Sequence, residues 1–426
     1  MKFESLCMIG LGYIGLPTAA VFASRKIKVV GVDVNQQAVD IINRGEIHIV
    51  EPDLDIAVHS AVKEGYLRAT TTPEPADAFI VAVPTPFLKG RKAGDIPTPD
   101  VSYIEAASKA IAPVLEKGNI VILESTSPVG ATEKMAAWLA EARPDLTFPQ
   151  DAGEQADVMI AHCPERVLPG RVMYELIEND RVIGGMTPRC ARTACDLYKT
   201  FVRGDCLLTT ARTAEMVKLT ENAFRDVNIA FANELSIICD KVDINVWELI
   251  SLANRHPRVN ILQPGPGVGG HCIAVDPWFI VSETPEQARL IRTAREVNDS
   301  KPEWVVNKVR LAIATFLQAN TEKTAKDVTI ACYGIAFKPD IDDLRESPAL
   351  EITKEIVAIH PGKVLVVEPN ISELPESFER SELVEFDKAM DVADIQVMLV
   401  DHRSFKRQKK IETDCEFCVD VRGVWN

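Results

Sequence analysis

Short hydrophobic runs alternate with amphipathic stretches along residues 1–205 of the chain. Each run is hydrophobic at nearly every position, which is typical of a strand that is covered on both faces. Strands that alternate with helices predict a parallel sheet wrapped by helices, an α/β fold of the doubly wound Rossmann type. The runs that we expect to form strands are 5–9, 28–33, 78–84, 119–125 and 157–162.

The pattern changes near residue 213. Residues 213–242 contain neither Gly nor Pro, so we predict one long helix there, and a second helical stretch is predicted at 285–319. Strand-like runs then resume and predict a second, smaller Rossmann-like α/β domain. These later runs are 327–334, 363–368, 395–401 and 417–421.

The order of elements predicts three regions, because the chain is longer than one hydrophobic core usually serves. We expect an N-terminal dinucleotide-binding domain at residues 1–205 and a central helical region at 206–310. The second α/β domain is expected at residues 311–426.

The composition narrows the classes of partner. The 426 residues are 46% hydrophobic and 26% charged, which is ordinary for a globular protein. No apolar run approaches the ~20 residues that a membrane span needs, so we expect a cytoplasmic protein with no membrane partner. The formal net charge of −15 argues against a nucleic-acid partner, because phosphate backbones recruit basic surfaces.

The cysteines do not form a disulfide or metal framework in the sequence. Ten are scattered over the chain, and most are expected to remain thiols in a reducing compartment. Cys415 and Cys418 form a lone C-x-x-C with no second pair. We therefore expect no metal site and assign this apolar stretch to a core strand.

A glycine-rich turn follows the first predicted strand. Gly10, Gly12 and Gly15 lie between that strand and a helix, where a pyrophosphate can approach the helix N-terminus. The second strand ends at Asp33, whose carboxylate can accept hydrogen bonds from ribose hydroxyls and would repel a 2′-phosphate. A tight turn without a ligand would need the glycines but not this acid, so the pattern predicts NAD.

Two later strands end in hydroxyl-bearing residues. In a doubly wound sheet, the carboxyl ends of the strands meet the ligand, so hydroxyls there can contact the nicotinamide half of the cofactor. The residues expected to line the cofactor from this region are Gly10, Gly12, Tyr13, Ile14, Gly15, Asp33, Thr85 and Thr126.

The long central helix carries a polar trio. Lys218, Asn222 and Arg225 are spaced i, i+4 and i+7, so they project from one face of the helix. A solvated polar stripe would have the same spacing. The alternative is a catalytic face, which the neighbouring nucleotide-binding pattern favours.

One cysteine stands directly after a flexible turn. GPGVGGHCIAVDP places Cys272 behind a run of glycines, where backbone can pass close to a ligand. If the following segment begins helically, Asp276 lies one turn from the sulfur. Beside an NAD site, a thiolate can add to an aldehyde, and oxidation of the thiohemiacetal gives a thioester. A buried, inert cysteine is the alternative, and the preceding glycines argue against it.

Long blocks of the sequence, taken together, are similar to one known family. The chain resembles, along nearly its whole length, the nucleotide-sugar 6-dehydrogenases of the UDP-glucose/GDP-mannose dehydrogenase superfamily. The blocks are GLGYIGLPTA, VPTPF, ESTSPVG, HCPERVLPG, AEMVKLTENAFRDVNIAFANEL, RHPRVNILQPGPGVGGHCIAVDP, YGIAFKPDIDDLRESPALEI and VVEPN.

The resemblance implies a four-electron oxidation of a sugar 6-hydroxyl to a carboxylate with two NAD in turn. By this resemblance, Cys272 is the nucleophile and Lys218 is a general acid or base that acts on the reacting oxygen of the sugar. Asn222 would hold the same oxygen or a water. Asp276 matches the carboxylate near the hydrolytic water, and Glu165 a glutamate implicated in thioester hydrolysis.

The resemblance also implies how the substrate binds. A UDP-sugar brings two phosphates, which local positive charge must meet. The uridine would bind mainly to the second α/β domain, Arg345 would reach the cofactor, and the long helix would pair with its copy in a homodimer. The substrate-binding residues that it implies are Arg166, Val167, Lys218, Asn222, Arg225, His256, Arg258, Gly269, Phe337 and Lys338.

Two positions favour the acetamido-sugar branch of the family. The glucose-specific branch has a second glutamate where this chain has Pro169, and a lysine where it has Val275. The resemblance favours UDP-N-acetyl-D-mannosamine as substrate and a role in cell-surface polysaccharide synthesis. UDP-GlcNAc and UDP-GalNAc are not excluded, because one stereocentre is a small free-energy difference. A single-step β-hydroxyacid-type dehydrogenase and a catalytically silent nucleotide-sugar sensor are the competing functions outside this branch.

Overall fold

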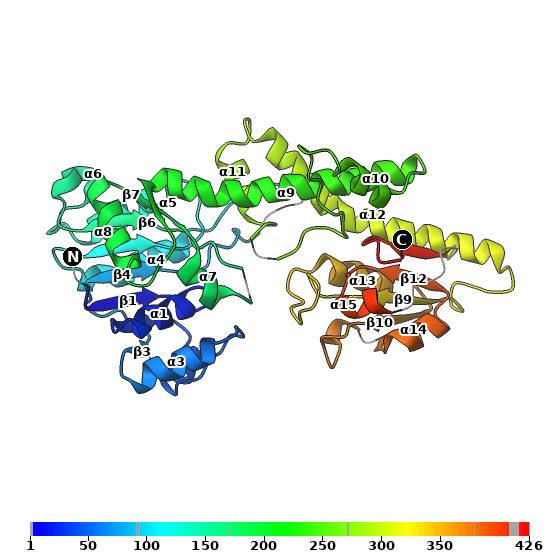
Figure 1. Ribbon diagram of the computed structural model, residues 1–426, viewed down its shortest axis with the longest axis horizontal. Helices are drawn as coiled ribbons and strands as arrows, with labels where there is room; N and C mark the ends of the chain where they lie inside the picture. Colours follow the sequence, from blue (N-terminus) through cyan, green and yellow to red (C-terminus); the bar gives the residue numbers. More distant parts are fainter. Residues whose placement is uncertain are drawn as a thin grey trace. The chain divides into compact units, whose positions relative to one another are not determined.

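The structure is a computed structural model and describes residues 3–90, 92, 94–168, 170–270, 272–378, 380–408 and 417–425. Pro169 and Cys415, both used in the sequence argument, lie outside the described residues. The chain divides into two compact units, one up to Glu221 and one from Asn222 onward (Figure 1). A separate central region at 206–310 stays a prediction.

The first unit is built on an eight-stranded sheet in the order β3-β2-β1-β4-β5-β6-β7-β8. Neighbouring strands are parallel except β6 and β7, which are antiparallel. The five predicted strands are confirmed, whereas β3, β7 and β8 were not predicted. The strands are β1 (Ser5–Ile9), β2 (Lys28–Val32), β3 (Leu67–Thr70), β4 (Ala78–Val81), β5 (Ile120–Leu123), β6 (Met159–His162), β7 (Arg181–Gly185) and β8 (Cys206–Thr210).

Helices cover both faces of this sheet, as the continuous hydrophobicity of its strands predicts (Figure 1). Successive residues of β1 show this, because Leu6 and Met8 belong to one core cluster and Cys7 and Ile9 to another. The helices are α1 (Gly15–Ser24), α2 (Gln36–Asn43), α3 (Leu54–Lys63), α4 (Ser102–Ile111), α5 (Ala131–Ala142), α6 (Pro149–Ala152), α7 (Val172–Glu178) and α8 (Pro188–Tyr198).

The second unit contains a five-stranded, fully parallel sheet in the order β11-β10-β9-β12-β13. The four predicted strands are confirmed, and the short edge strand β11 was not predicted. Alternate residues of β9 again face two separate cores, which confirms the second α/β fold. The strands are β9 (Thr329–Tyr333), β10 (Lys363–Val367), β11 (Ser381–Leu383), β12 (Ile395–Met398) and β13 (Cys418–Asp420).

Two helices of 31 residues each, α9 (Ala211–Lys241) and α12 (Arg289–Ala319), confirm the long helices expected from the sequence. The division between the units falls within α9. The remaining helices of the second unit are α10 (Val246–Ala253), α11 (Asp276–Glu283), α13 (Pro348–Ile359), α14 (Phe386–Val392) and α15 (Arg403–Arg407). Among the described residues, no helix combines the length and the hydrophobicity that crossing a membrane requires.

A buried polar network links the second half of α9 to α12. Arg295, 1% exposed, donates from Nη1 to Oδ1 of Asp226, 0% exposed, at 2.6 Å. Asn298 donates to the same oxygen at 2.8 Å and accepts from Asn233 at 2.8 Å. Burial raises the pKa of Asp226, and the Arg295 guanidinium opposes this rise. The two helices are therefore joined by a charge pair that is shielded from water.

Replacing Arg295 by Met is expected to destabilise the second unit by about 3–5 kcal/mol, because the buried Asp226 loses its countercharge. Urea denaturation followed by circular dichroism measures the loss. The matched control is Arg292→Met on the same helix, whose ion pair with Glu296 is about half exposed and is expected to contribute less than about 1 kcal/mol. Equal losses in the two variants would contradict a special role for the buried pair.

Candidate active site

The glycine turn between β1 and α1 has the geometry of a pyrophosphate site. Gly10 has φ +92°, and a Cβ there would lie 2.5 Å from the carbonyl oxygen of Ala82. At Gly15 a Cβ would lie 1.8 Å from the oxygen of Gly10, so no other residue fits. A Cβ at Gly12 would meet nothing within 4 Å, and this open space lies at the N-terminal end of α1. These residues therefore fit a dinucleotide.

Asp33 ties the end of β2 to the same turn. Its Oδ2 accepts a hydrogen bond from the backbone N–H of Leu11 at 3.0 Å, and its Oδ1 accepts one from Asn35 at 2.9 Å. Ile14 stands at the N-cap of α1, and Tyr13 beside it is 42% exposed. The turn and the acid thus lie together, while the contact of Asp33 with a ribose stays a prediction.

The two predicted threonines meet at the carboxyl edge of the first sheet. Thr85 follows β4, Thr126 follows β5, and the Thr85 hydroxyl donates to the Thr126 carbonyl at 2.6 Å. The strand order reverses between β1 and β4, which is the position where doubly wound sheets bind ligands. The structure therefore places both threonines on the side of the sheet where the glycine turn lies.

The segment after β6 holds three more predicted site residues. Glu165 is 8% exposed and lies 2.9 Å from the Arg181 guanidinium. Arg166 forms a bidentate pair with Glu221, with distances of 2.6 and 3.1 Å, so a substrate phosphate would compete with this carboxylate. Val167 packs against the hydrophobic core of the first unit. Its direct contact with a substrate stays a prediction.

The sequence argument missed two residues near Glu165, namely Glu124 and Arg181. Glu124 lies at the end of the predicted strand 119–125, within ESTSPVG, so its place at the strand end was available as a signal. Arg181 begins β7, whose antiparallel course the sequence pattern did not predict.

The polar trio of α9 lies on an unbroken helix, as its spacing predicts. Lys218 and Asn222 are half-buried, and Arg225 is exposed. The Asn222 amide donates from Nδ2 to Oδ2 of Asp276, which is 3% exposed. The structure therefore brings two of the predicted catalytic residues into contact.

Cys272 and Asp276 are joined by a helical turn. The backbone N–H of Asp276 donates to the carbonyl oxygen of Cys272 at 2.9 Å, and α11 begins at Asp276. The Cys272 side chain is exposed, unlike most of the cysteines described. The one-turn separation and the accessible thiol are confirmed, whereas the catalytic roles of both residues stay predictions.

The glycine loop before Cys272 packs against the loop after β9. A Cβ at Gly269 would lie 2.2 Å from the Glu346 carbonyl oxygen, and the N–H of Gly270 donates to that oxygen at 3.3 Å. A Cβ at Gly270 would meet the Phe337 ring at 3.5 Å. Gly269 is thus fixed by close backbone packing, which brings two predicted substrate-binding residues, Gly269 and Phe337, into one region.

The remaining predicted cations of the second unit are spread over several segments. Lys338 lies 5.6 Å from the Phe337 ring centre, and Arg345 forms a bidentate pair with Asp343 at 2.9 and 2.7 Å. His256 and Arg258 follow α10 and are exposed. Across the described part of the second unit, no hydrogen bond or ion pair joins these last two to the glycine loop.

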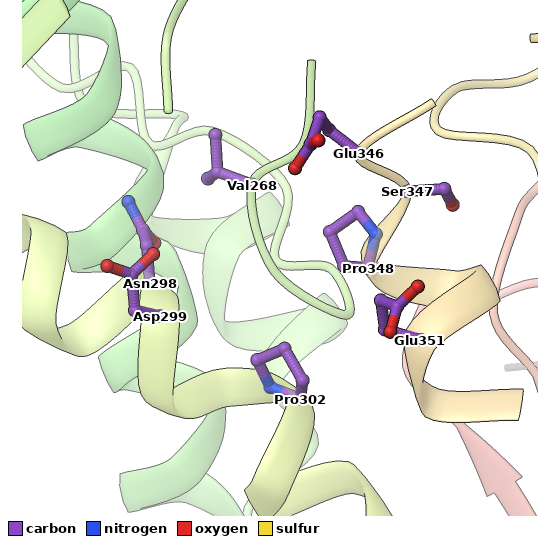
Figure 2. Close-up of a pocket in the computed structure, with 8 residues that line it drawn as sticks. All are labelled: Val268, Asn298, Asp299, Pro302, Glu346, Ser347, Pro348 and Glu351. Atoms are coloured by element: carbon purple, nitrogen blue, oxygen red, sulfur yellow. The ribbon is translucent and has the colours of Figure 1, made fainter. Parts of the chain in front are cut away.

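A pocket of about 210 Å³ lies beside the glycine loop within the second unit. Figure 2 shows the residues of α12 on one side and those of the segment leading into α13 on the other. Three carboxylates line it and would repel a diphosphate, so we do not assign the nucleotide to it. The lining residues are Val268, Asn298, Asp299, Pro302, Glu346, Ser347, Pro348 and Glu351. Elsewhere too, the described ranges contain no metal-binding group of three or more His, Cys, Asp or Glu side chains.

Solved structures and curated proteins similar to this chain were identified by comparison. A UDP-N-acetyl-D-mannosamine dehydrogenase of Escherichia coli K12 is 65% identical over 426 residues, which is all of both chains. An NDP-N-acetyl-D-galactosaminuronic acid dehydrogenase of Ralstonia solanacearum is 62% identical over all of this chain and 97% of its own. A UDP-D-ManNAc dehydrogenase structure from Pyrococcus horikoshii has a TM-score of 0.82 at 37% identity, covering 99% of this chain and 96% of the other.

Three family models together match most of the chain. They describe the NAD binding domain, the central domain and the UDP binding domain of the UDP-glucose/GDP-mannose dehydrogenase family, at residues 4–202, 212–300 and 331–426. These matches confirm the resemblance, NAD as cofactor and a UDP-sugar as the class of substrate. The chain belongs to the UDP-glucose/GDP-mannose dehydrogenase family.

Proposed function

We propose that this protein oxidises UDP-N-acetyl-D-mannosamine at C6 to UDP-N-acetyl-D-mannosaminuronate in two NAD-dependent steps. The observation that carries the proposal is the identity of 65% with the Escherichia coli enzyme named for that sugar, over the full length of both chains. The exposed thiol of Cys272, one helical turn from Asp276, supplies the nucleophile that such a reaction needs.

The first oxidation gives an aldehyde that the protein must retain. Bound NAD would accept the hydride at each of the two oxidations. Lys218 exchanges a proton with the sugar hydroxyl and stabilises negative charge on its oxygen. The Cys272 thiolate adds to the aldehyde carbon, and this thiohemiacetal is oxidised to a thioester. Water then attacks the thioester, Glu165 accepts its proton, and the carbon–sulfur bond breaks to release the carboxylate and the thiolate.

Asp276 orients Asn222 for this chemistry. The carboxylate is almost fully buried and accepts one N–H of the Asn222 amide, which fixes the rotation of the amide group. The other N–H and the amide oxygen remain available for the reacting oxygen or a water. Asp276 therefore acts through Asn222 as well as through its position one helical turn from Cys272.

The substrate diphosphate needs positive charge that the strongly acidic chain supplies only locally. Arg166, Arg225, Arg258 and Lys338, with His256, are the cations that we assign to it. The domain at residues 331–426 binds the uridine part, and Phe337 of this domain lies against Gly270 of the glycine loop.

A second candidate substrate is the galactosamine sugar, a stereoisomer of the mannosamine sugar. The Ralstonia solanacearum relative named for N-acetyl-D-galactosaminuronic acid is 62% identical over all of this chain, nearly as similar as the mannosamine enzymes. Because the two sugars are stereoisomers that differ within one ring, a few side chains of the pocket can decide between them.

We also propose that the protein is a cytoplasmic homodimer that supplies cell-surface polysaccharide synthesis. Three hydrophobic side chains recur every seven residues along α9 and are exposed: Phe224 at 71%, Phe231 at 51% and Ile238 at 49%. Such a stripe on one helix face is suited to pairing with its own copy.

The proposed reaction predicts two NADH for each molecule of UDP-N-acetyl-D-mannosamine consumed. The absorbance of NADH, measured with a fixed amount of the sugar substrate, gives the number of NADH formed. Parallel assays with UDP-GlcNAc and UDP-GalNAc test which sugar is the preferred substrate. We expect kcat/KM to be at least about tenfold higher for the mannosamine sugar, a difference of about 1.4 kcal/mol. Equal or faster turnover of either epimer would contradict the assignment, and one NADH per sugar would favour a single-step dehydrogenase.

The Cys272→Ser variant tests the thioester route. Because a serine hydroxyl is far less nucleophilic than a thiolate at neutral pH, uronate formation should fall by a factor of about 10³ or more. Cys195→Ser is the matched variant, since Cys195 lies on α8 and has no assigned role. Full uronate formation by Cys272→Ser would refute the covalent mechanism.

If the exposed hydrophobic stripe on α9 forms the dimer interface, one charge introduced into it should disrupt the dimer. Phe231→Glu places a carboxylate in the apolar face and should shift the mass measured by light scattering from dimer to monomer. Ile56→Glu, at a hydrophobic position on α3 that is more exposed than Phe231, should leave the mass unchanged. A monomeric wild-type mass would contradict the proposal outright.

A further inference from the structure

Four side chains that are shielded from water form a cluster around the carboxylate of Glu165 in the first unit. Glu124 follows β5, Glu165 follows β6, Arg181 begins β7, and Tyr198 ends α8. Because β7 runs antiparallel to β6, its first residue lies at the same edge of the sheet as the carboxyl end of β6. That reversal brings a guanidinium between two glutamates.

The contacts within this cluster are close, and its side chains are almost fully buried. The Arg181 guanidinium lies 2.9 Å from Glu165 and 3.5 Å from Glu124, and it is 4% exposed. The Tyr198 hydroxyl donates to Glu124 at 3.0 Å, and its ring lies 4.8 Å from the guanidinium. The backbone N–H of Arg166 donates to Glu165 at 2.7 Å.

One guanidinium cannot neutralise two buried carboxylates. If both glutamates were ionised, the cluster would keep an uncompensated negative charge away from water, which is strongly unfavourable. Burial, with the nearby Glu165 carboxylate, raises the pKa of Glu124 to about 8, so Glu124 is neutral at pH 7. Arg181 lies closer to Glu165 than to Glu124, so the guanidinium pairs mainly with Glu165.

Two further titratable side chains that contact the Arg181 guanidinium, Tyr198 and Cys163, remain neutral near pH 8. The charged side chains Arg166, Glu175 and Asp180 line the adjoining pocket with Glu165 and Arg181. Burial raises the pKa of Tyr198 well above its usual value, and it also raises the pKa of Cys163, whose sulfur lies 3.9 Å from the Arg181 guanidinium. Among Glu124, Tyr198 and Cys163, the described side chains in contact with Arg181 whose pKa is raised by burial, Glu124 is thus the one whose charge changes between pH 7 and 9.

We propose that Arg181 is the positioning residue that holds Glu165 ionised and oriented for thioester hydrolysis, and that a neutral Glu124 keeps Arg181 paired with Glu165. This inference rests on the proposed function. The attacking water gives its proton to Glu165 and its oxygen to the thioester carbon, and the Cys272 thiolate leaves. An ionised Glu124 would draw Arg181 away from Glu165 and slow that step alone.

The decay of the Cys272 thioester tests the inference. The intermediate is formed with UDP-N-acetyl-D-mannosamine and NAD at pH 7, the pH is changed, and quenched samples are analysed by intact-protein mass spectrometry. Glu124 is neutral below its pKa and ionised above it. Decay in the wild type should therefore slow about tenfold from pH 7 to pH 9, one unit above that pKa.

Glu124→Gln keeps a neutral group at this position, so its decay at pH 9 should be at least as fast as at pH 7. Glu154→Gln is the matched control, because Glu154 is about half exposed and its ion pair with Arg192 lies at the surface. That variant should keep the wild-type slowing. A wild-type slowing that persists in Glu124→Gln, or no slowing in the wild type, would overturn the inference.

Arg181→Lys separates positioning from a merely structural role. The ammonium keeps the charge but loses the planar fork of the guanidinium. Thioester decay should slow about tenfold or more, while the burst of NADH that precedes it changes less than about twofold. An equal fall in burst and decay, or no fall in decay, would overturn the positioning role.

An infrared measurement without substrate tests the neutral glutamate independently. The carbonyl stretch of a protonated carboxylic acid should be present at pH 7, disappear above about pH 8, and be absent from Glu124→Gln. If that band is seen but no sugar is oxidised, the proposed function fails while the charge arrangement stands. Absence of the band in the wild type at pH 7 would overturn the inference.

Discussion

The candidate cofactor site and the buried charge cluster depend on one constraint of the first sheet, which is that the ends of its strands collect functional side chains at one edge. Parallel strands place their carboxyl ends together, so the segments after β1, β4, β5 and β6 meet there. The antiparallel strand β7 adds its amino end to the same edge. The glycine turn and Glu165, the carboxylate that we propose for hydrolysis, thus share one sheet edge because of backbone direction alone.

Close backbone packing supplies the second constraint, in the other unit. Gly269 cannot carry a side chain because the Glu346 carbonyl occupies the space, and this contact fixes the loop that leads to Cys272. The helical turn that follows sets the thiol and Asp276 one turn apart. The Cys272 sulfur is therefore exposed on a loop whose course is determined by packing, so that it is both accessible and held in a defined position.

The sequence predicted the strands and helices whose hydrophobic pattern is long and regular. It also predicted the glycine turn with Asp33, because each of those residue types has a local physical reason. It did not predict β7, whose RVIGG pattern ends in two glycines. A β-branched core strand with glycines gives a weak signal, and its antiparallel direction is set by its pairing with β6 and not by a local sequence pattern. Arg181 could not be placed beside Glu165 without that pairing.

Both units contain a nearly dry arginine held by carboxylates, Arg181 in the first and Arg295 in the second. Hydrophobic side chains of similar volume often stabilise a protein as well as a buried ion pair does, because desolvation offsets most of the attraction. Stability alone therefore does not explain these pairs. What a buried pair supplies and a hydrophobic contact does not is direction, since a guanidinium fixes where its partner carboxylate points. For Arg181 that partner is Glu165, so the fold accepts the desolvation of a charge where it orients the carboxylate that we propose as the proton acceptor.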